Sequence, residues 1–128
     1  MIPFDFHAAM PPNKPNYYLI CPENFCKATP NQISPVFSMS VQQLENKWMQ
    51  MISEQPRVTL INKDPNTQQY FYVARSAVFK FPDFITVRFI SLTENTSTIA
   101  LFSQAKYGYY DFDVNKKRLI TWLDFLKQ

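Results

Sequence analysis

Glycine, histidine and cysteine are scarce in this sequence of 128 residues: Gly108 and His7 stand alone, and there are two cysteines. One glycine excludes a glycine-rich phosphate-binding loop. One histidine and two cysteines do not supply the roughly four ligands of a zinc site. Serine or cysteine nucleophiles normally need a base, and His7 lies in a proline-rich segment. The sequence therefore predicts no metal and no cofactor, and it gives an enzyme little support.

Long apolar runs and a strong charge of one sign are also missing. No run approaches the roughly 20 residues that cross a bilayer, and no charged segment followed by an apolar one opens the chain. The net charge is +3, but lysine and arginine are scattered among the acids, apart from the cluster at residues 116–118. Nucleic-acid-binding proteins usually carry a broader basic stripe. These patterns predict a soluble protein that does not bind nucleic acid.

The sequence does contain enough apolar and aromatic residues for one core. Apolar residues make up 46% of the chain and aromatic residues 16%, which suits a single compact domain of this length. Seven of the ten prolines fall in residues 1–37 and forbid a long helix there. We expect that segment to be an extended N-terminal arm packed on the domain, because its aromatic side chains need burial. Residues 38–128 are predicted to form a single α+β domain.

Periodicity predicts two helices and four strands within residues 38–128. Ser40 and Gln43 form a capping-box pattern at the start of the first helix, and Pro56 sets its end. Four β-prone runs follow at residues 57–62, 69–79, 84–92 and 98–104, with short connections that favour antiparallel neighbours. The last helix is expected to begin near Asp113. The predicted fold is an antiparallel sheet of about four strands with both helices on one face, in the order α-β-β-β-β-α.

The second face of such a sheet must also be accounted for. Depending on register, Tyr70, Tyr72, Phe84 and Phe102 are candidates for it. Coverage by the N-terminal arm is one interpretation. An exposed apolar patch for a lipid, a polymer or a partner chain is a second, and a homodimer through this face is a third.

Two cysteines, Cys21 and Cys26, lie in the motif CPENFC, which is neither a C-x-x-C redox motif nor a metal site. Two alternatives stay open: a local disulfide in an oxidising compartment, or two free thiols in the cytosol. Pro22 and Asn24 suit a tight turn between the sulfur atoms and favour the disulfide.

Several motifs together resemble a known family. CPENFC is followed by SPVF, by FPDFITVRF and by STIALFSQAKYGYYDFDVNKKRLITWL, and this pattern resembles the domain-of-unknown-function family 1499 across roughly residues 17–126. The resemblance implies a family of bacteria and plastid-bearing organisms with no settled activity, whose members often carry a leader or membrane anchor. It therefore implies a cell-envelope or periplasmic setting with a membrane-peripheral location, and the cytoplasm is the alternative. The family's most specific positions fall on Ser103, Gly108, Asp111, Asn115, Lys116 and Arg118.

This sequence departs from the family pattern at three positions. Gln104 replaces a frequent arginine, Tyr110 a small polar residue and Asp113 a glycine. If the family shares a charged site there, this chain has lost one cation from it.

The segment YGYYDFDVNKKRL, residues 107–119, admits a structural interpretation as the corner between the last strand and the last helix. Gly108 supplies a left-handed backbone angle, and Asp113 or Asp111 caps the helix. Arg118 is expected to pair with Asp111 or Asp83.

The same segment also admits two functional interpretations. An anionic ligand is one, with candidate binding residues Arg88, Ser103, Gly108, Asp111, Asn115, Lys116 and Arg118. The other is a small enzyme of unknown reaction that uses Asp83, Arg88, Asp111 and Arg118 around Gly108. Overall, the sequence favours a non-catalytic binding or structural module of the bacterial cell envelope that recognises a partner protein or an amphipathic or anionic small molecule.

Overall fold

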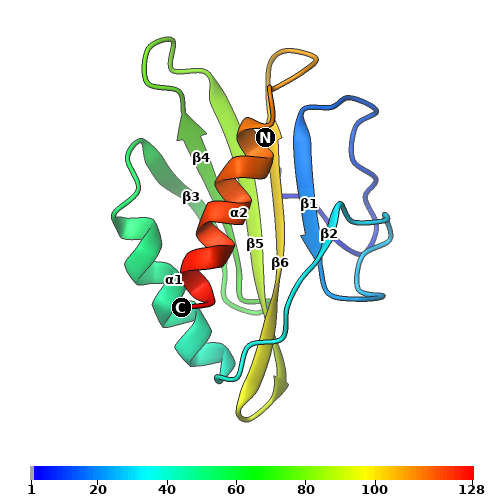
Figure 1. The fold of residues 1–128 in the computed structure, drawn as a ribbon, viewed down its shortest axis with the longest axis vertical. Coiled ribbons are helices and arrows are strands. Elements are labelled where there is room, and N and C mark those ends of the chain that lie inside the picture. The colour runs from blue at the N-terminus through cyan, green and yellow to red at the C-terminus, as the bar shows by residue number, and fades with distance from the viewer. Residues whose placement is uncertain (1) are drawn as a thin grey trace.

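The computed structural model describes residues 2–128; Met1, the first residue of the predicted arm, lies outside the described residues. The fold is α+β, with two helices and one six-stranded sheet (Figure 1). The helices are α1 (Val41–Ser53) and α2 (Val114–Leu126). The strands are β1 (Tyr17–Cys21), β2 (Gln32–Ile33), β3 (Val58–Asp64), β4 (Gln69–Arg75), β5 (Pro82–Thr93) and β6 (Thr96–Ala105).

The sheet is larger than the sequence predicts, and it is mixed rather than purely antiparallel. Its strand order is β2-β1-β6-β5-β4-β3, in which β1 and β2 are parallel and all other neighbours are antiparallel. The two extra strands come from the segment predicted as an arm, since β1 pairs with β6 and places Leu19 opposite Phe102. The surrounding prolines exclude a helix there but leave the five residues of β1 free to add to the sheet.

Both helices pack on one face of the sheet, as Figure 1 shows. Alternation along β5 turns Ile85, Val87 and Phe89 toward the helices, and all three are buried. Ser40 and Gln43 form the predicted capping box at the start of α1. This face therefore holds the main core of the protein.

Tyr70 and Tyr72 also lie on the helix-covered face, so their proposed place on the second face is wrong. The Trp48 indole donates a hydrogen bond of 3.0 Å to the Tyr72 hydroxyl, and burial raises the pKa of Tyr72 to about 12. The Tyr70 hydroxyl donates a bond of 2.6 Å to Glu45. Because side chains alternate with a period of two, a one-residue difference in register moves a whole set of side chains to the other face.

The N-terminal segment packs on part of the second face. Phe4 stacks on Phe102 with ring centroids 4.0 Å apart, and its backbone amide donates to the Thr86 hydroxyl. Phe6 is buried in the same cluster, together with Leu19 of β1. Phe4 and Phe6 therefore bury part of the aromatic surface of this face.

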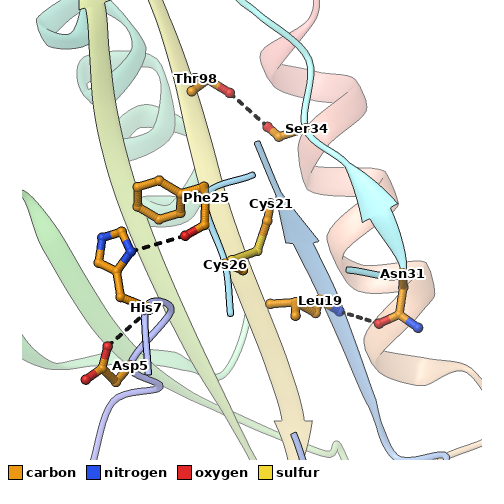
Figure 2. The surroundings of a disulfide bond; sticks show 9 residues. All are labelled: Asp5, His7, Leu19, Cys21, Phe25, Cys26, Asn31, Ser34 and Thr98. Atoms are coloured by element: carbon orange, nitrogen blue, oxygen red, sulfur yellow. Dashed lines mark hydrogen bonds between the residues drawn. A yellow bond between two sulfur atoms is a disulfide. The ribbon is translucent and has the colours of Figure 1, made fainter. Parts of the chain in front are cut away.

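Cys21 and Cys26 form a disulfide at the end of β1 (Figure 2), with Cα atoms 6.2 Å apart. Inside the closed loop, the Phe25 carbonyl lies 3.1 Å from Nδ1 of His7. The Lys27 amide donates to the Phe6 carbonyl, so the disulfide loop also holds the first residues of the segment. No helix within residues 2–128 has the length and apolar character that crossing a membrane requires.

Six residues other than glycine have a left-handed backbone conformation within residues 2–128. Asn24 and Asp113 have positive φ, as expected for Asn and Asp in a chain with one glycine. Other side chains adopt the same conformation, namely Arg57, Gln68, Lys80 and Phe112. Most of these positions gather near one end of the sheet, where Gly108 also has a φ of +86°.

Candidate functional site

Two loops project from the same end of the sheet, one between β4 and β5 (residues 76–81) and one between β6 and α2 (residues 106–113), as Figure 1 shows. They meet because antiparallel pairing places the end of β4, the start of β5 and the end of β6 side by side. Asp83 of β5 stands opposite Ala105 of β6 at this point. The predicted corner around Gly108 belongs to the second loop.

A buried amide lies at the centre of this corner. Asn115 in the first turn of α2 is fully buried, and its Nδ2 donates to Asp111 at 2.7 Å and to the Asn16 carbonyl at 3.3 Å. Its Oδ1 accepts a hydrogen bond from the Ser103 hydroxyl of β6. Asn115 therefore ties β6, α2, the corner loop and the residue before β1 together.

Arg118, one turn further along α2, completes the network. One guanidinium nitrogen donates to Asp83 at 2.9 Å, to Asn115 at 2.7 Å and to the Ser103 hydroxyl at 3.2 Å. The side chains of Arg118 and Asp83 are only 18% and 15% exposed, so the ion pair is shielded from much of the solvent. The sequence prediction that Arg118 pairs with Asp111 or Asp83 resolves in favour of Asp83.

The two carboxylates of the corner are both engaged by protein donors. Burial raises the pKa of Asp83 and the nearby Asp111 raises it further, while the charge and hydrogen bond of Arg118 lower it. Asp111 accepts from the backbone amides of Asp113 and Asn115 and from the Asn115 side chain. Asp111 is therefore the residue that satisfies amides at the start of α2, and the side chain of Asp113 makes no capping bond.

A pocket of about 680 Å³ opens beside this network. Its polar wall includes Asp83, Asp111 and Arg118, and two further arginines reach it from the start of β3 and the end of β4. Aromatic and small apolar side chains from the two loops complete the lining. The full set is Arg57, Arg75, Ser76, Phe81, Asp83, Ala105, Tyr107, Gly108, Tyr110, Asp111, Phe112, Val114 and Arg118.

Two of the predicted binding residues lie elsewhere. Arg88 is on the opposite face of the sheet, with its guanidinium 5.7 Å from the centre of the Phe25 ring. It alternates with Val87, which faces the helices, so it does not join Asp83 and Arg118. Lys116 lines a separate pocket of about 300 Å³ with Lys14 and other residues of the outer surface.

The residues that sequence reasoning missed are Asn16, Arg57 and Arg75. Asn16 is buried and its Nδ2 donates to the carbonyl of Gly108 at 3.1 Å, which fixes the corner loop. The arginines could have been found from the sequence. Two consecutive antiparallel strands place the start of β3 and the end of β4 at the same end of the sheet, next to the corner. Asn16 has no comparable signal, since its partner is distant in the sequence.

Gly108→Ala is expected to destabilise the protein by about 1–2 kcal/mol through backbone strain alone. The φ of +86° disfavours a side chain, whereas no atom lies within 4 Å of the position that a Cβ atom would take. Denaturant unfolding measures the loss, and Lys106→Ala in the same loop is the control. An unchanged midpoint would show that the loop relaxes without needing glycine.

The pocket can hold a ligand. Its two carboxylates, Asp83 and Asp111, already accept hydrogen bonds from other residues of the protein. Within residues 2–128, no group of three His, Cys, Asp or Glu side chains is placed to hold a metal ion. Asp83 and Asp111 accept hydrogen bonds from the protein itself, as described above. The open donors of the site are instead the guanidinium groups of Arg57 and Arg75 at the pocket.

Comparison with known proteins gives a family and nothing more specific. No curated protein and no solved structure matches the chain. The disulfide, the sheet from β3 to β6 and the buried network at the corner all fall within the residues that a family profile matches. Over residues 9–126 the chain matches, and therefore belongs to, the family described as Protein of unknown function (DUF1499).

Proposed function

We propose that this chain is a non-catalytic binding module of the cell envelope that recognises an amphipathic anionic molecule in the pocket at the end of the sheet. The observation that carries the proposal is a pair of arginines without acidic partners. Across residues 2–128, the ion pairs join Arg118 to Asp83 and Lys127 to Asp124, so Arg57 and Arg75 line the pocket without an ion pair of their own, although Asp83 and Asp111 belong to the same lining.

The two guanidinium groups are held in place but not saturated. Nε of Arg57 donates to the Arg75 carbonyl at 3.0 Å, and Arg75 donates to the Lys80 carbonyl at 3.0 Å. A guanidinium carries five N–H donors, so most donors on each remain for a ligand. Planar donors of this kind suit a carboxylate, phosphate or sulfate group.

The rest of the pocket supplies apolar contact. Phe81, Tyr107 and Tyr110 line it beside the arginines, and its volume of about 680 Å³ lies within the range of small-molecule sites. An anionic head bound by the arginines therefore has aromatic walls for an apolar tail. The disulfide supports a cell-envelope setting, because such bonds persist mainly in oxidising compartments.

Isothermal titration with dodecyl phosphate, kept below its micelle concentration, tests the proposal against inorganic phosphate as the head group alone. We expect the alkyl phosphate to bind more tightly than phosphate. The double variant Arg57→Gln/Arg75→Gln should lose roughly tenfold or more in affinity. Lys127→Gln, at the other end of α2, is the control that removes one cationic side chain away from the pocket.

Two results would contradict the proposal. Equal affinity for dodecyl phosphate in the wild type and the double arginine variant would mean that the ligand binds elsewhere. If neither probe binds to the wild type, the pocket does not bind an anionic small molecule, and a partner protein becomes the favoured ligand.

A further inference from the structure

We propose that the end of the sheet carrying the two loops docks on the surface of an anionic phospholipid bilayer. The loops expose side chains that normally lie in a core: Val78 is 79% exposed, Phe79 74%, Tyr109 66% and Phe112 74%. Figure 1 shows both loops projecting beyond the sheet at this end. This inference goes beyond the pocket, because Val78, Phe79 and Tyr109 do not line it.

Exposed aromatic residues are confined to this place. Within residues 2–128, every Phe, Tyr or Trp that is exposed lies in one of the two loops. We call this set the aromatic rim. It consists of Phe79, Phe81, Tyr107, Tyr109, Tyr110 and Phe112. A distribution of this kind differs from the scattered single apolar residues of an ordinary protein surface.

Five of the six rings of the rim contact one another, in two separate groups. Phe79 stacks on Phe81 with centroids 5.5 Å apart, and Phe81 meets Tyr107 of the other loop at 6.3 Å. Tyr110 and Phe112 lie 4.8 Å apart. The rim is thus ordered before it meets a partner, which lowers the entropic cost of binding.

The charges around the rim complement an anionic surface. Lys80 and Lys106 lie in the two loops, and Arg57 and Arg75 lie at their base. The loop of residues 76–81 contains no acid. The acids of the other loop are Asp113 and Asp111, and the Asp111 oxygens accept bonds from within its own corner.

Aromatic side chains with basic residues beside them suit the bilayer interface in particular. Tyrosine rings place an apolar body among acyl chains and a hydroxyl among head groups, and lysine extends its ammonium to the phosphate layer. Basic residues near an anionic leaflet each add attraction that salt screens.

Co-sedimentation of the purified protein with vesicles tests the proposal. Vesicles of phosphatidylcholine with phosphatidylglycerol are compared with phosphatidylcholine alone, at low and high salt. We expect binding to the anionic vesicles only, weakened by salt. Val78→Ser/Phe79→Ser should lower the partition coefficient by roughly tenfold, given the apolar surface removed.

Leu92→Ser is the matched control, because Leu92 is an exposed apolar residue in the β5–β6 hairpin at the opposite end of the sheet. It should bind vesicles like the wild type. Val78→Ser/Phe79→Ser should still bind dodecyl phosphate, because neither residue lines the pocket. Binding of this probe therefore distinguishes the membrane proposal from the pocket proposal. The proposal is overturned if the wild type stays in the supernatant, if it binds neutral vesicles equally well, or if both variants lose the same affinity.

Discussion

Arg118→Ala is expected to lower the free energy of unfolding by about 3 kcal/mol at neutral pH. The substitution removes the one cation that pairs with Asp83 among residues 2–128 and leaves that carboxylate half-buried. It also removes the donor to the Ser103 hydroxyl and to Oδ1 of Asn115, both buried. The loss comes mainly from the unpaired, half-buried Asp83 carboxylate, because the Ser103 hydroxyl still donates to Oδ1 of Asn115.

The stability lost in Arg118→Ala should depend on pH, because it depends on whether Asp83 is ionised. Burial raises the pKa of Asp83 in the folded protein, and Arg118 opposes that rise. A group with a raised folded pKa favours the folded state most when protonated, and that contribution falls as the pH rises through the folded value. Without Arg118, the pKa of Asp83 in the folded protein is raised further. Arg118→Ala should therefore lose less stability at about pH 4 than at pH 7.

Chemical denaturation from about pH 4 to pH 7 measures this difference. Lys117→Ala, one residue away and exposed, is the control and should change stability by no more than about 0.5 kcal/mol. Asp83→Asn/Arg118→Gln should recover part of the loss, because neither charge is then left alone. A pH-independent loss would show that Asp83 is solvated once Arg118 is gone.

Asn115→Ala is expected to destabilise the protein by about 3 kcal/mol, since it disconnects four segments at once. Asn115 bonds Ser103 of β6, Asp111 of the corner loop, the Asn16 carbonyl and Arg118 of its own helix. Each of these groups is buried or half-buried. The lost bonds therefore cannot all be replaced by water.

Asn115→Leu separates hydrogen bonding from volume, because leucine fills similar space without polar atoms. We expect a loss close to that of Asn115→Ala, measured by urea unfolding. Thr121→Ala, exposed on the same helix, is the control. If leucine restored wild-type stability, the network would contribute through packing alone and the amide would not be needed.

Local signals predicted much of this molecule correctly. The capping box at Ser40 depends on residues three apart, and the pairing of Cys21 with Cys26 depends on one turn. Ser103, Asp111, Asn115 and Arg118, which the family resemblance groups as candidate binding residues, form one hydrogen-bonded cluster, and their binding of a ligand stays a prediction. Short-range geometry fixes the capping box and the disulfide, so a single sequence contains the information for these two features.

The features that were missed depend on long-range pairing. β1 was predicted as part of an arm, because its partner β6 lies at the far end of the chain. The face of Tyr72 depends on the register of β4, which local sequence does not set, whereas alternation with Val87 is enough to place Arg88 on the other face from Arg118. Arg57 and Arg75 are a further exception, because pairing two strands that follow each other in the sequence is enough to place both at the corner's end of the sheet.

The pairing of β1 with β6 has a consequence for biosynthesis. The first strand leaves the ribosome early, yet its partner is nearly the last element to emerge. Until then Leu19 and Ile20 have no sheet to bury them, whereas Cys21 and Cys26 are close enough in sequence to be oxidised beforehand. A chain that lost β1 would leave β6 as an open edge and invite strand-to-strand aggregation. β1 therefore covers the edge of β6 only after most of the chain has been synthesised.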